Sequence, residues 1–555
     1  MKRCMLGRKF SKAGFLAAVM ALVLAVSACG GAPAAPPPAG GVTATPATPV
    51  APAAGADAAA PAADGEIGTV VWVSMSEPPT LDSNAPGGNN SATADLLYSV
   101  LEKLVRWAPV DGAVLEGQLA TSWERGADAS EWIFNLRQGV YFTDGTPFNA
   151  HAVQRSLMRV IDPDTNSPVA FILEMMESVD IIDDYTVQIN LHFPFAPFPN
   201  HLAHPAGNIL SPALLDRAEA SGDPPVYITE NMVGTGPFMI DHWEPGDYRR
   251  LVPNPNHWGV VPQVNVEFRV IPAAETRSAM LNAGEAHITN LAPAHYVVAR
   301  GWGHVNFIAV DTSQITWISM NTQRGYLQDV RVRQAIAKAT DREAIFYGPF
   351  EGLGTLPISP LTHFIAYNPP DAQALPFDPE RARELMHEAG FGPDNRLALT
   401  IGSNEGNMPR AQTAELLQSD LRDIYIDLEI QIMEWGAYLE ATGAGLLDMH
   451  ILGWGVITAD ADYGLYSTFH TSGWGDPGNR FFYSNPRVDA LLDEGRMAES
   501  ARRTEIYAEA IDIIVNDAPG VWLIHPTQMF GLNGVEGITI SFNSNPRFYN
   551  ARLTN

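Results

Sequence analysis

A segment made almost entirely of alanine, glycine and proline separates the N-terminus of this chain from everything after it. Residues 30–65 hold 29 Ala, Gly or Pro among 36 positions, and only Asp57 and Asp64 carry charge. Such a composition cannot bury a hydrophobic core, and its prolines favour extended backbone. We therefore expect a disordered tether over 29–65. The 490 residues beyond it (555 minus 65) are too many for one core and should form two or three lobes.

The residues before the tether are typical of a secretion signal. A positively charged start is followed by 16 uncharged, mostly apolar residues over 13–28, fewer than the roughly 20 of a membrane span. Small residues then lead directly to Cys29, which resembles the bacterial lipobox. This predicts a signal peptide over 1–28 and a lipid anchor on Cys29; a plain signal peptide with an incidental cysteine is the alternative.

Cysteine content and charge exclude several classes of protein. The two cysteines, Cys4 and Cys29, both lie before residue 30, so the folded body has no disulfide and no cysteine-ligated metal. The chain has 34 basic and 62 acidic residues, a net charge of −28. This balance argues against nucleic-acid partners and against electrostatic adhesion to anionic lipid.

Hydrophobic periodicity in the body predicts helices alternating with strands. Over 184–193, apolar side chains alternate with polar ones, which is typical of a half-buried strand. A helical pattern over 408–424 runs directly into an alternating pattern over 426–435. Two further amphipathic helices are expected over 485–495 and 501–518, the second ending before Pro519. The predicted fold class is therefore mixed α/β in more than one lobe.

The sequence contains no complete motif for catalysis or for binding a metal. The chain lacks G-x-S-x-G, H-E-x-x-H, a P-loop and a helix-opening G-x-G-x-x-G. "DADYG", from Asp460, begins like a calcium loop, but Thr471 stands where the closing glutamate should be. "VGTGPF" (233–238) could suggest a phosphate cradle, yet Pro237 removes an amide donor, so a tight turn with close backbone approach is favoured. We expect no enzyme, no cofactor and no metal.

An ordered series of motifs resembles one known family. The series comprises "SEPPTLD", "DGAVLEGQLATSWE" with "WIFNLRQGVYFTDGTPFNAHAV", "VGTGPFMIDHWEPGD" with "LVPNPNHW", "VIPAAETRSAMLNAGEAHI", "DVRVRQAIAKATDREAI", "GWGVITADADYGLYSTFH" and "YSNPRVDALLDE". Together they resemble the bacterial extracellular solute-binding proteins of the oligopeptide, dipeptide and nickel group (family 5), which are receptors of ABC importers.

The resemblance implies a periplasmic-binding-protein-like fold of two hinged α/β lobes, with an extra lobe inserted in the first (type II). On this pattern lobe I is discontinuous and lobe II closes over the ligand. The implied boundaries are 66–90, 200–310 and 525–555 for lobe I, 91–199 for the inserted lobe and 311–524 for lobe II. The implied function is capture of extracellular peptides by lobe closure and delivery to a membrane permease with its ATPase. We expect a monomer, lipid-anchored in the cell envelope on the outer face of the cytoplasmic membrane.

Site residues follow from the same resemblance. Peptide-binding relatives line their pocket with a Gly-Trp pair, and an aspartate three residues after the tryptophan binds the peptide's ammonium. Here Trp454, Gly455 and Val456 match the pocket segment, but Ile457 stands in the aspartate's place. A buried ammonium without a carboxylate would cost several kcal/mol, so the usual amine anchor is missing.

Other acidic and polar residues remain candidates. Asp460 and Asp462 match two further acidic positions of the motif and could substitute, although capping a helix that starts near Tyr463 is the favoured interpretation. Three residues lie in segments that line the cleft in relatives: Glu77, Thr235 and Asn321. The arginines at 331 and 333 are expected to cap or solvate the start of a helix.

Three alternative functions stay open at this stage. The same receptor could carry a non-amine ligand, such as an oligosaccharide, a modified peptide or a metal chelate, and the loss of the aspartate at Ile457 favours this. Tryptophan side chains could stack sugars. An exported hydrolase is disfavoured because no nucleophile and base motif is present. A surface adhesin or chaperone-like protein is disfavoured because the motif series is so long.

Overall fold

The computed structural model describes residues 67–88, 90–108, 113–475 and 478–554. The predicted signal peptide, Cys29 and the predicted tether lie outside these ranges. Within them, no helix combines the length and the apolar character needed to cross a membrane.

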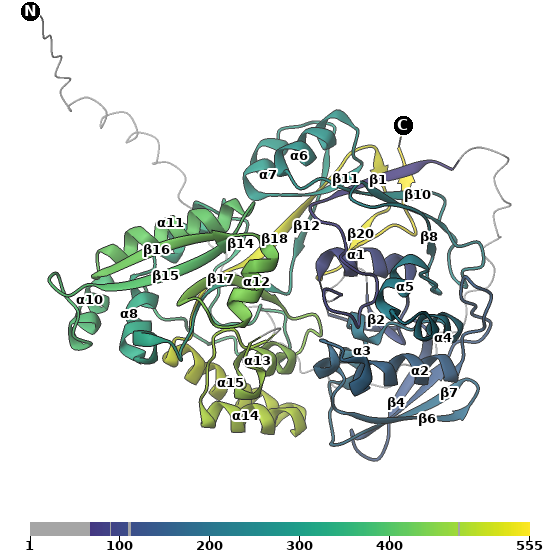
Figure 1. The fold of residues 1–555 in the computed structure, drawn as a ribbon, viewed down its shortest axis with the longest axis horizontal. Helices are drawn as coiled ribbons and strands as arrows, with labels where there is room; N and C mark the ends of the chain where they lie inside the picture. The colour runs from purple at the N-terminus through teal and green to yellow at the C-terminus, as the bar shows by residue number, and fades with distance from the viewer. Residues whose placement is uncertain (1–66, 89, 109–112, 476–477, 555) are drawn as a thin grey trace, which may run out of the picture. The chain divides into compact units, whose positions relative to one another are not determined.

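A long mixed sheet runs through the molecule in two halves (Figure 1). The first half-sheet comprises β1 (Thr69–Ser74), β8 (Phe238–Glu244), β9 (Tyr248–Pro253), β10 (Asn265–Val270), β11 (Ile288–Leu291) and β12 (Asn306–Asp311). The second half-sheet comprises β13 (Gln314–Met320), β15 (Leu397–Asn404), β16 (Ile426–Met433) and β17 (Met449–Gly455).

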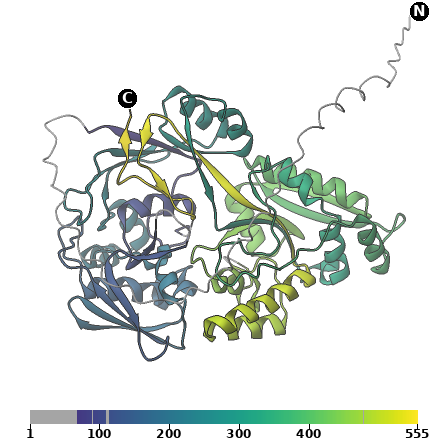
Figure 2. The same ribbon diagram turned by 180° about the vertical axis from the view of Figure 1, so that it is seen from behind.

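One strand, β18 (Gly520–Leu532), belongs to both halves. Its first residues pair with β13, and the residues from Thr527 onward pair with β11 and β12. Figures 1 and 2 show this strand, in yellow, running between the two halves. The second link is the short turn at Thr312 and Ser313, which joins β12 to β13. Two crossing segments therefore connect the halves.

A separate four-stranded sheet has the order β4-β5-β7-β6. Residues 102–209, which contain this sheet, are called the four-strand unit below. Its elements are β2 (Val105–Trp107), β3 (Leu115–Gly117), β4 (Ala120–Arg125), β5 (Glu131–Leu136), α2 (Ala150–Ile161), β6 (Met176–Asp183), β7 (Thr186–Leu191) and α3 (Phe198–Leu202). In β7, alternate residues are buried, as the sequence predicts.

Helix α1 (Ser91–Val100) packs its apolar side chains with the first half-sheet. Its Leu96 and Leu97 share a buried cluster with Trp72 of β1. The turn at Gly234 presses against the end of this helix, where a Cβ would lie 2.0 Å from the carbonyl oxygen of Val100. The close backbone approach predicted for residues 233–238 is confirmed. Helix α1 itself lies inside the range 91–199 predicted for the inserted lobe.

Helices flank the second half-sheet: α8 (Val330–Ala339), α9 (Arg342–Tyr347), α10 (Pro379–Glu388), α11 (Met408–Arg422), α12 (Trp435–Gly443), α13 (Ala461–Phe469), α14 (Pro486–Met497) and α15 (Ser500–Asp517). The predicted helix-to-strand passage is confirmed as α11 followed by β16, which is parallel to β15. The two amphipathic helices predicted over 485–495 and 501–518 are confirmed as α14 and α15. The mixed α/β class predicted from the sequence is correct.

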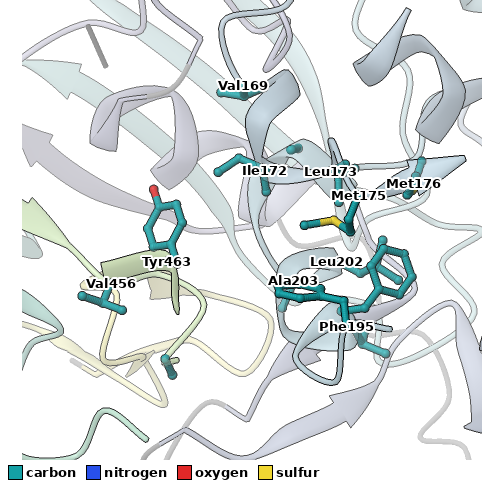
Figure 3. Close-up of a cluster of buried hydrophobic side chains, with 14 of the residues drawn as sticks. Val169, Ile172, Leu173, Met175, Met176, Phe195, Leu202, Ala203, Val456 and Tyr463 are labelled. Carbon is teal, nitrogen blue, oxygen red and sulfur yellow. The ribbon is translucent and has the colours of Figure 1, made fainter. Parts of the chain in front are cut away.

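One hydrophobic cluster joins the four-strand unit to the second half. Figure 3 shows Val456 and Tyr463 on one side and Ile172, Leu173 and Ala203 on the other. Burial of these side chains stabilises contact between the two regions, since each buried apolar side chain contributes about 1.5–3 kcal/mol. The structure therefore represents a state in which the two regions are closed on each other.

Candidate functional site

The segment that carries the predicted pocket residues leaves the second half-sheet and enters α13. Trp454 lies opposite Ile315 at the end of β17. Gly453 permits this pairing, because a Cβ there would lie 2.4 Å from the carbonyl oxygen of Ile315. Helix α13 then begins at Ala461, with the Asp460 side chain accepting a hydrogen bond from the Asp462 amide at 2.9 Å.

The loop between β17 and α13 is held by the four-strand unit. The Trp107 indole donates to the carbonyl oxygen of Ile457 at 2.8 Å, and the Asn200 amide donates to that of Thr458 at 3.1 Å. Val456 is buried in the shared hydrophobic cluster. This loop therefore lies at the boundary between the two regions.

An aromatic wall lies at this boundary. The rings of Trp454 and Tyr463 are 5.5 Å apart, and Tyr463 also lies 6.3 Å from Phe171 and 6.0 Å from His204 of the four-strand unit. The Trp454 indole nitrogen is buried and has no hydrogen-bond partner among the described residues. Aromatic faces of this kind accept apolar or planar ligand groups.

A cavity of about 250 Å³ adjoins Tyr463. Phe171, Glu174 and His201 line it from the four-strand unit, and Asp462 and Arg496 line it from α13 and α14. Its full lining is Phe171, Glu174, His201, Asp462, Tyr463, Tyr466, Ser467, Ser472, Gly473, Trp474, Gly478 and Arg496. Both regions therefore contribute to its walls.

Charged groups in this cavity form one hydrogen-bonded ion pair and two longer contacts. Arg496 lies 3.0 Å from Glu174 across the boundary, and its Nε is 3.6 Å from Asp462 Oδ1. His201 Nε2 lies 3.9 Å from Asp462 Oδ2. Burial raises the pKa of Asp462 to about 6 and lowers the pKa of His201 to about 4. Asp462 Oδ1, Arg496 Nε and His201 Nε2 are buried without hydrogen-bond partners among the described residues.

Asp460 has a structural role. Its carboxylate accepts two hydrogen bonds from the Arg503 guanidinium, one of them at 2.9 Å, and both side chains are buried. It also caps α13, as the sequence predicts, although the helix starts two residues earlier than Tyr463. A contact between Asp460 and a ligand stays a prediction, and we leave this residue out of the proposed site.

The remaining predicted residues, like Trp454, Gly455, Val456 and Asp460, are not part of the cavity lining. The Glu77 carboxylate accepts from the Trp243 indole at 2.8 Å and from the Gly246 amide at 2.9 Å. Asn321 donates to the carbonyl oxygen of Gly445 at 3.1 Å. Thr235 is buried, and its hydroxyl has no partner among the described residues. Ligand contacts for Glu77, Thr235 and Asn321 stay predictions.

The two arginines of α8 are bound within the protein. Arg331 pairs with Asp329, the residue that caps this helix, at an N–O separation of 2.6 Å. Arg333 donates to the carbonyl oxygens of Leu327 and Asp517. Asp329 is thus the cap, and the expectation that the arginines cap or solvate the helix start is wrong for Arg333, which is buried.

Sequence reasoning missed His201, Glu174 and Arg496. Arg496 follows the predicted helix over 485–495, where it resembles any exposed helical arginine. His201 and His204 stand in a Pro-rich stretch without metal-ligand spacing, which gave no reason to select them. Only the packing of α14 against the four-strand unit brings these side chains together.

Comparison with known proteins agrees with this architecture. The model of "Bacterial extracellular solute-binding proteins, family 5 Middle" matches residues 114–476, more than half of the chain. The probable D,D-dipeptide-binding periplasmic protein DdpA of Escherichia coli (strain K12) is 28% identical over 465 residues, covering 82% of this chain and 88% of the relative. The glutathione-binding protein GsiB of Pectobacterium atrosepticum is 30% identical over 415 residues, covering 73% and 79%.

Among solved structures, the periplasmic binding protein DppA from Helicobacter pylori, in complex with the peptide STSA, superposes with a TM-score of 0.80. It is 26% identical, and the match covers 88% of this chain and 98% of that one. The two connected half-sheets, the boundary cavity and these matches lead to one assignment. The chain belongs to the bacterial extracellular solute-binding proteins of family 5.

Proposed function

We propose that this protein is the substrate-binding component of an ABC-type importer that captures short extracellular peptides at the boundary cavity. Ligand binding then holds the four-strand unit and the second half together, and the closed protein delivers its cargo to a membrane permease with its ATPase. No bond of the ligand is made or broken. The relatives named above, which bind dipeptides, glutathione or a peptide, support this ligand class.

The observation that carries the proposal is the two-sided wall of the cavity with its unpartnered polar atoms. A buried donor or acceptor without a partner costs about 1–3 kcal/mol. Such atoms on Asp462, Arg496 and His201 are the groups that a ligand's own donors and acceptors would satisfy. A ligand in contact with both walls stabilises the closed state, because an open state offers it half of these contacts.

A non-peptide ligand is the second candidate within the same receptor role. Ile457 stands where peptide-binding relatives are expected to carry the amine-binding aspartate, and the Trp454–Tyr463 wall offers stacking surfaces. An oligosaccharide, a modified peptide or a metal chelate would each avoid the need for that aspartate.

The location and assembly state are part of the proposal. Lipidation of Cys29 would hold the protein on the outer face of the cytoplasmic membrane, and residues 29–65 would act as a tether. A tether of this kind raises the local concentration of the receptor near its permease. We expect the receptor to act as a monomer.

Thermal unfolding with a ligand panel tests the function. We expect saturating di- to pentapeptides to raise the melting temperature, since a ligand at 100 times its Kd adds about 2.7 kcal/mol to the stability of the folded state. Arg496→Gln should lose most of this ligand-induced rise. Arg487→Gln is the matched control, because Arg487 lies on the same helix and pairs with Glu509 at the surface. A wild-type protein that shows no rise with any peptide would exclude peptides as its cargo.

A further inference from the structure

Two buried cations lie together close to Ile457 without a carboxylate partner. Lys103 is 2% exposed, and its Nζ lies 4.1 Å from the centre of the Tyr98 ring. Arg547 is 6% exposed, and its guanidinium carbon lies 6.0 Å from the same ring. Neither forms an ion pair within the described ranges. Arg547 Nη2 donates to the carbonyl oxygen of Trp107 at 2.9 Å, while its Nε has no partner there.

These cations adjoin the loop where the amine-binding aspartate is missing. The Trp107 indole donates to the carbonyl oxygen of Ile457, and the Asn543 amide lies 3.5 Å from the same oxygen. Asn543 also hydrogen-bonds the Tyr98 hydroxyl. A chain of direct contacts therefore connects Ile457 with Tyr98 and, through its ring, with both cations.

The charge of Lys103 acts on a side chain that contacts the cavity lining. The positive charge of Lys103 contributes to lowering the pKa of His204, so the two side chains are electrostatic neighbours. The His204 ring lies 6.0 Å from Tyr463, which lines the cavity. A ligand that extends from the cavity past Tyr463 toward His204 would come under the influence of the Lys103 charge.

Nearby carboxyl groups do not neutralise this charge. The Glu102 carboxylate accepts from Gln118 at 3.2 Å and from the Trp258 indole at 2.8 Å, and it forms no ion pair with Lys103. Asp95 accepts from Asn545 at 2.6 Å. Burial raises the pKa of Asp95 to about 8, so this group is mostly protonated at neutral pH. The surroundings of Lys103 and Arg547 thus keep a positive charge that Glu102 and Glu116 offset only in part.

We infer that Lys103 and Arg547 bind a carboxylate of the ligand next to Ile457, so that the ligand presents an anion where peptide-binding relatives are expected to hold an ammonium. The inference rests on the proposed function and specifies its ligand chemistry. Taking two cations out of water without a counter-charge is unfavourable, and a ligand carboxylate would restore the balance through charge-assisted hydrogen bonds. The replacement of an acidic residue by Ile457 removes the group that would repel such a carboxylate.

The charge state of Lys103 adds a pH dependence to this binding. Burial lowers the pKa of Lys103 to about 7; Arg547 and Arg106 lower it as well, and Glu102 opposes them. A carboxylate binds the protonated amine, which is depleted as the pH rises through this value. Affinity for a carboxylate ligand should therefore fall above about pH 7, by up to roughly tenfold per pH unit.

A double-mutant cycle on protein and ligand tests the inference. The probes are the peptides of the panel as free acids and as C-terminal amides, amidated peptides with a glutamate side chain, and the dicarboxylates succinate and glutarate. For carboxylate-bearing probes, calorimetry should show a roughly 10- to 100-fold loss of affinity in Lys103→Met. Amidation should weaken binding to the wild type similarly and change little in Lys103→Met, because both changes remove the same interaction.

Matched variants separate this effect from a folding defect. Lys338→Met makes the same substitution at the one other lysine of residues 67–554 and should leave affinity within about twofold. Lys103→Arg keeps the charge and should retain part of the affinity lost in Lys103→Met. Urea unfolding checks each variant, since replacing an unpaired buried cation by methionine is expected to be neutral or stabilising.

The outcomes distinguish this inference from the proposed function. Peptides that bind equally as acids and amides, or equally to wild type and Lys103→Met, would overturn the carboxylate site and leave the peptide receptor standing. A dicarboxylate that binds in a Lys103-dependent manner while all peptides fail would support the carboxylate site and exclude peptides as the cargo. If no carboxylate-bearing probe binds, the inference is wrong. Binding of amidated glutamate peptides would identify a side-chain carboxylate as the source.

Discussion

Replacing Arg503 by methionine should lower the free energy of unfolding by about 3–5 kcal/mol, the usual effect of breaking a buried ion pair from one side. Arg503 and Asp460 are 1% and 3% exposed, and the guanidinium donates to both carboxylate oxygens. The methionine would leave the Asp460 carboxylate buried without a counter-charge, at the end of the loop between β17 and α13. Urea unfolding followed by far-UV circular dichroism at pH 7 measures the change.

The neighbouring arginine provides the control. The Arg502 side chain is 48% exposed and pairs with Glu494 and Glu505 at the surface, so Arg502→Met should cost less than about 1 kcal/mol. Adding Asp460→Asn to Arg503→Met should recover part of the lost stability, because it removes the stranded charge. Equal effects of the two arginine substitutions would show that the buried pair is not a major contribution to stability.

Acidification from pH 7 to pH 5 should lower the free energy of unfolding by about 3 kcal/mol. Burial lowers the pKa values of four histidines: to about 4 for His201 and His525, and to about 3 for His204 and His450. As the pH falls below about 6.5, the unfolded chain takes up protons at these residues and the folded protein does not. Stability present above that pH is therefore lost. Asp95 and Asp462, whose pKa values are raised, act in the opposite direction and offset part of the loss.

His450 allows the contribution of a single histidine to this pH dependence of stability to be measured. It is buried in β17, and its Nε2 has no hydrogen-bond partner among the described residues. In His450→Gln, the slope of stability against pH near pH 5 should be smaller than in the wild type by about 1.4 kcal/mol per pH unit. His304→Gln, at an exposed position, should keep the wild-type slope. An unchanged slope in His450→Gln would contradict the predicted proton uptake.

The fold could be predicted to a large extent because its local patterns agree with its packing. The alternation over 184–193 appears as β7, and the helical pattern over 408–424 appears as α11. Hydrophobic periodicity could not show which helices and strands pack into the same hydrophobic core. Helix α1 has an ordinary amphipathic pattern, and only its contact with β1 shows that it packs on the first half-sheet.

The candidate site was harder to predict because its residues are far apart in sequence. Trp454 could be selected from its motif, and it does lie at the boundary. Glu174, His201 and Arg496 carry no local signal, since their meeting depends on the closure of one region on another. The role of Asp460 illustrates the same limit: its partner Arg503 lies 43 residues away on α15, and nothing in the intervening sequence indicates the pairing.

The position of β18 has a consequence for the order in which the chain can assemble. This strand spans Gly520–Leu532, more than 200 residues after β11 (Ile288–Leu291), yet it fills the central place between β11 and β13. Until it emerges, both neighbours present unpaired strand edges, which readily associate with other chains. A nascent polypeptide therefore cannot complete either half-sheet until residues 520–532 have left the ribosome, however early the other strands are made.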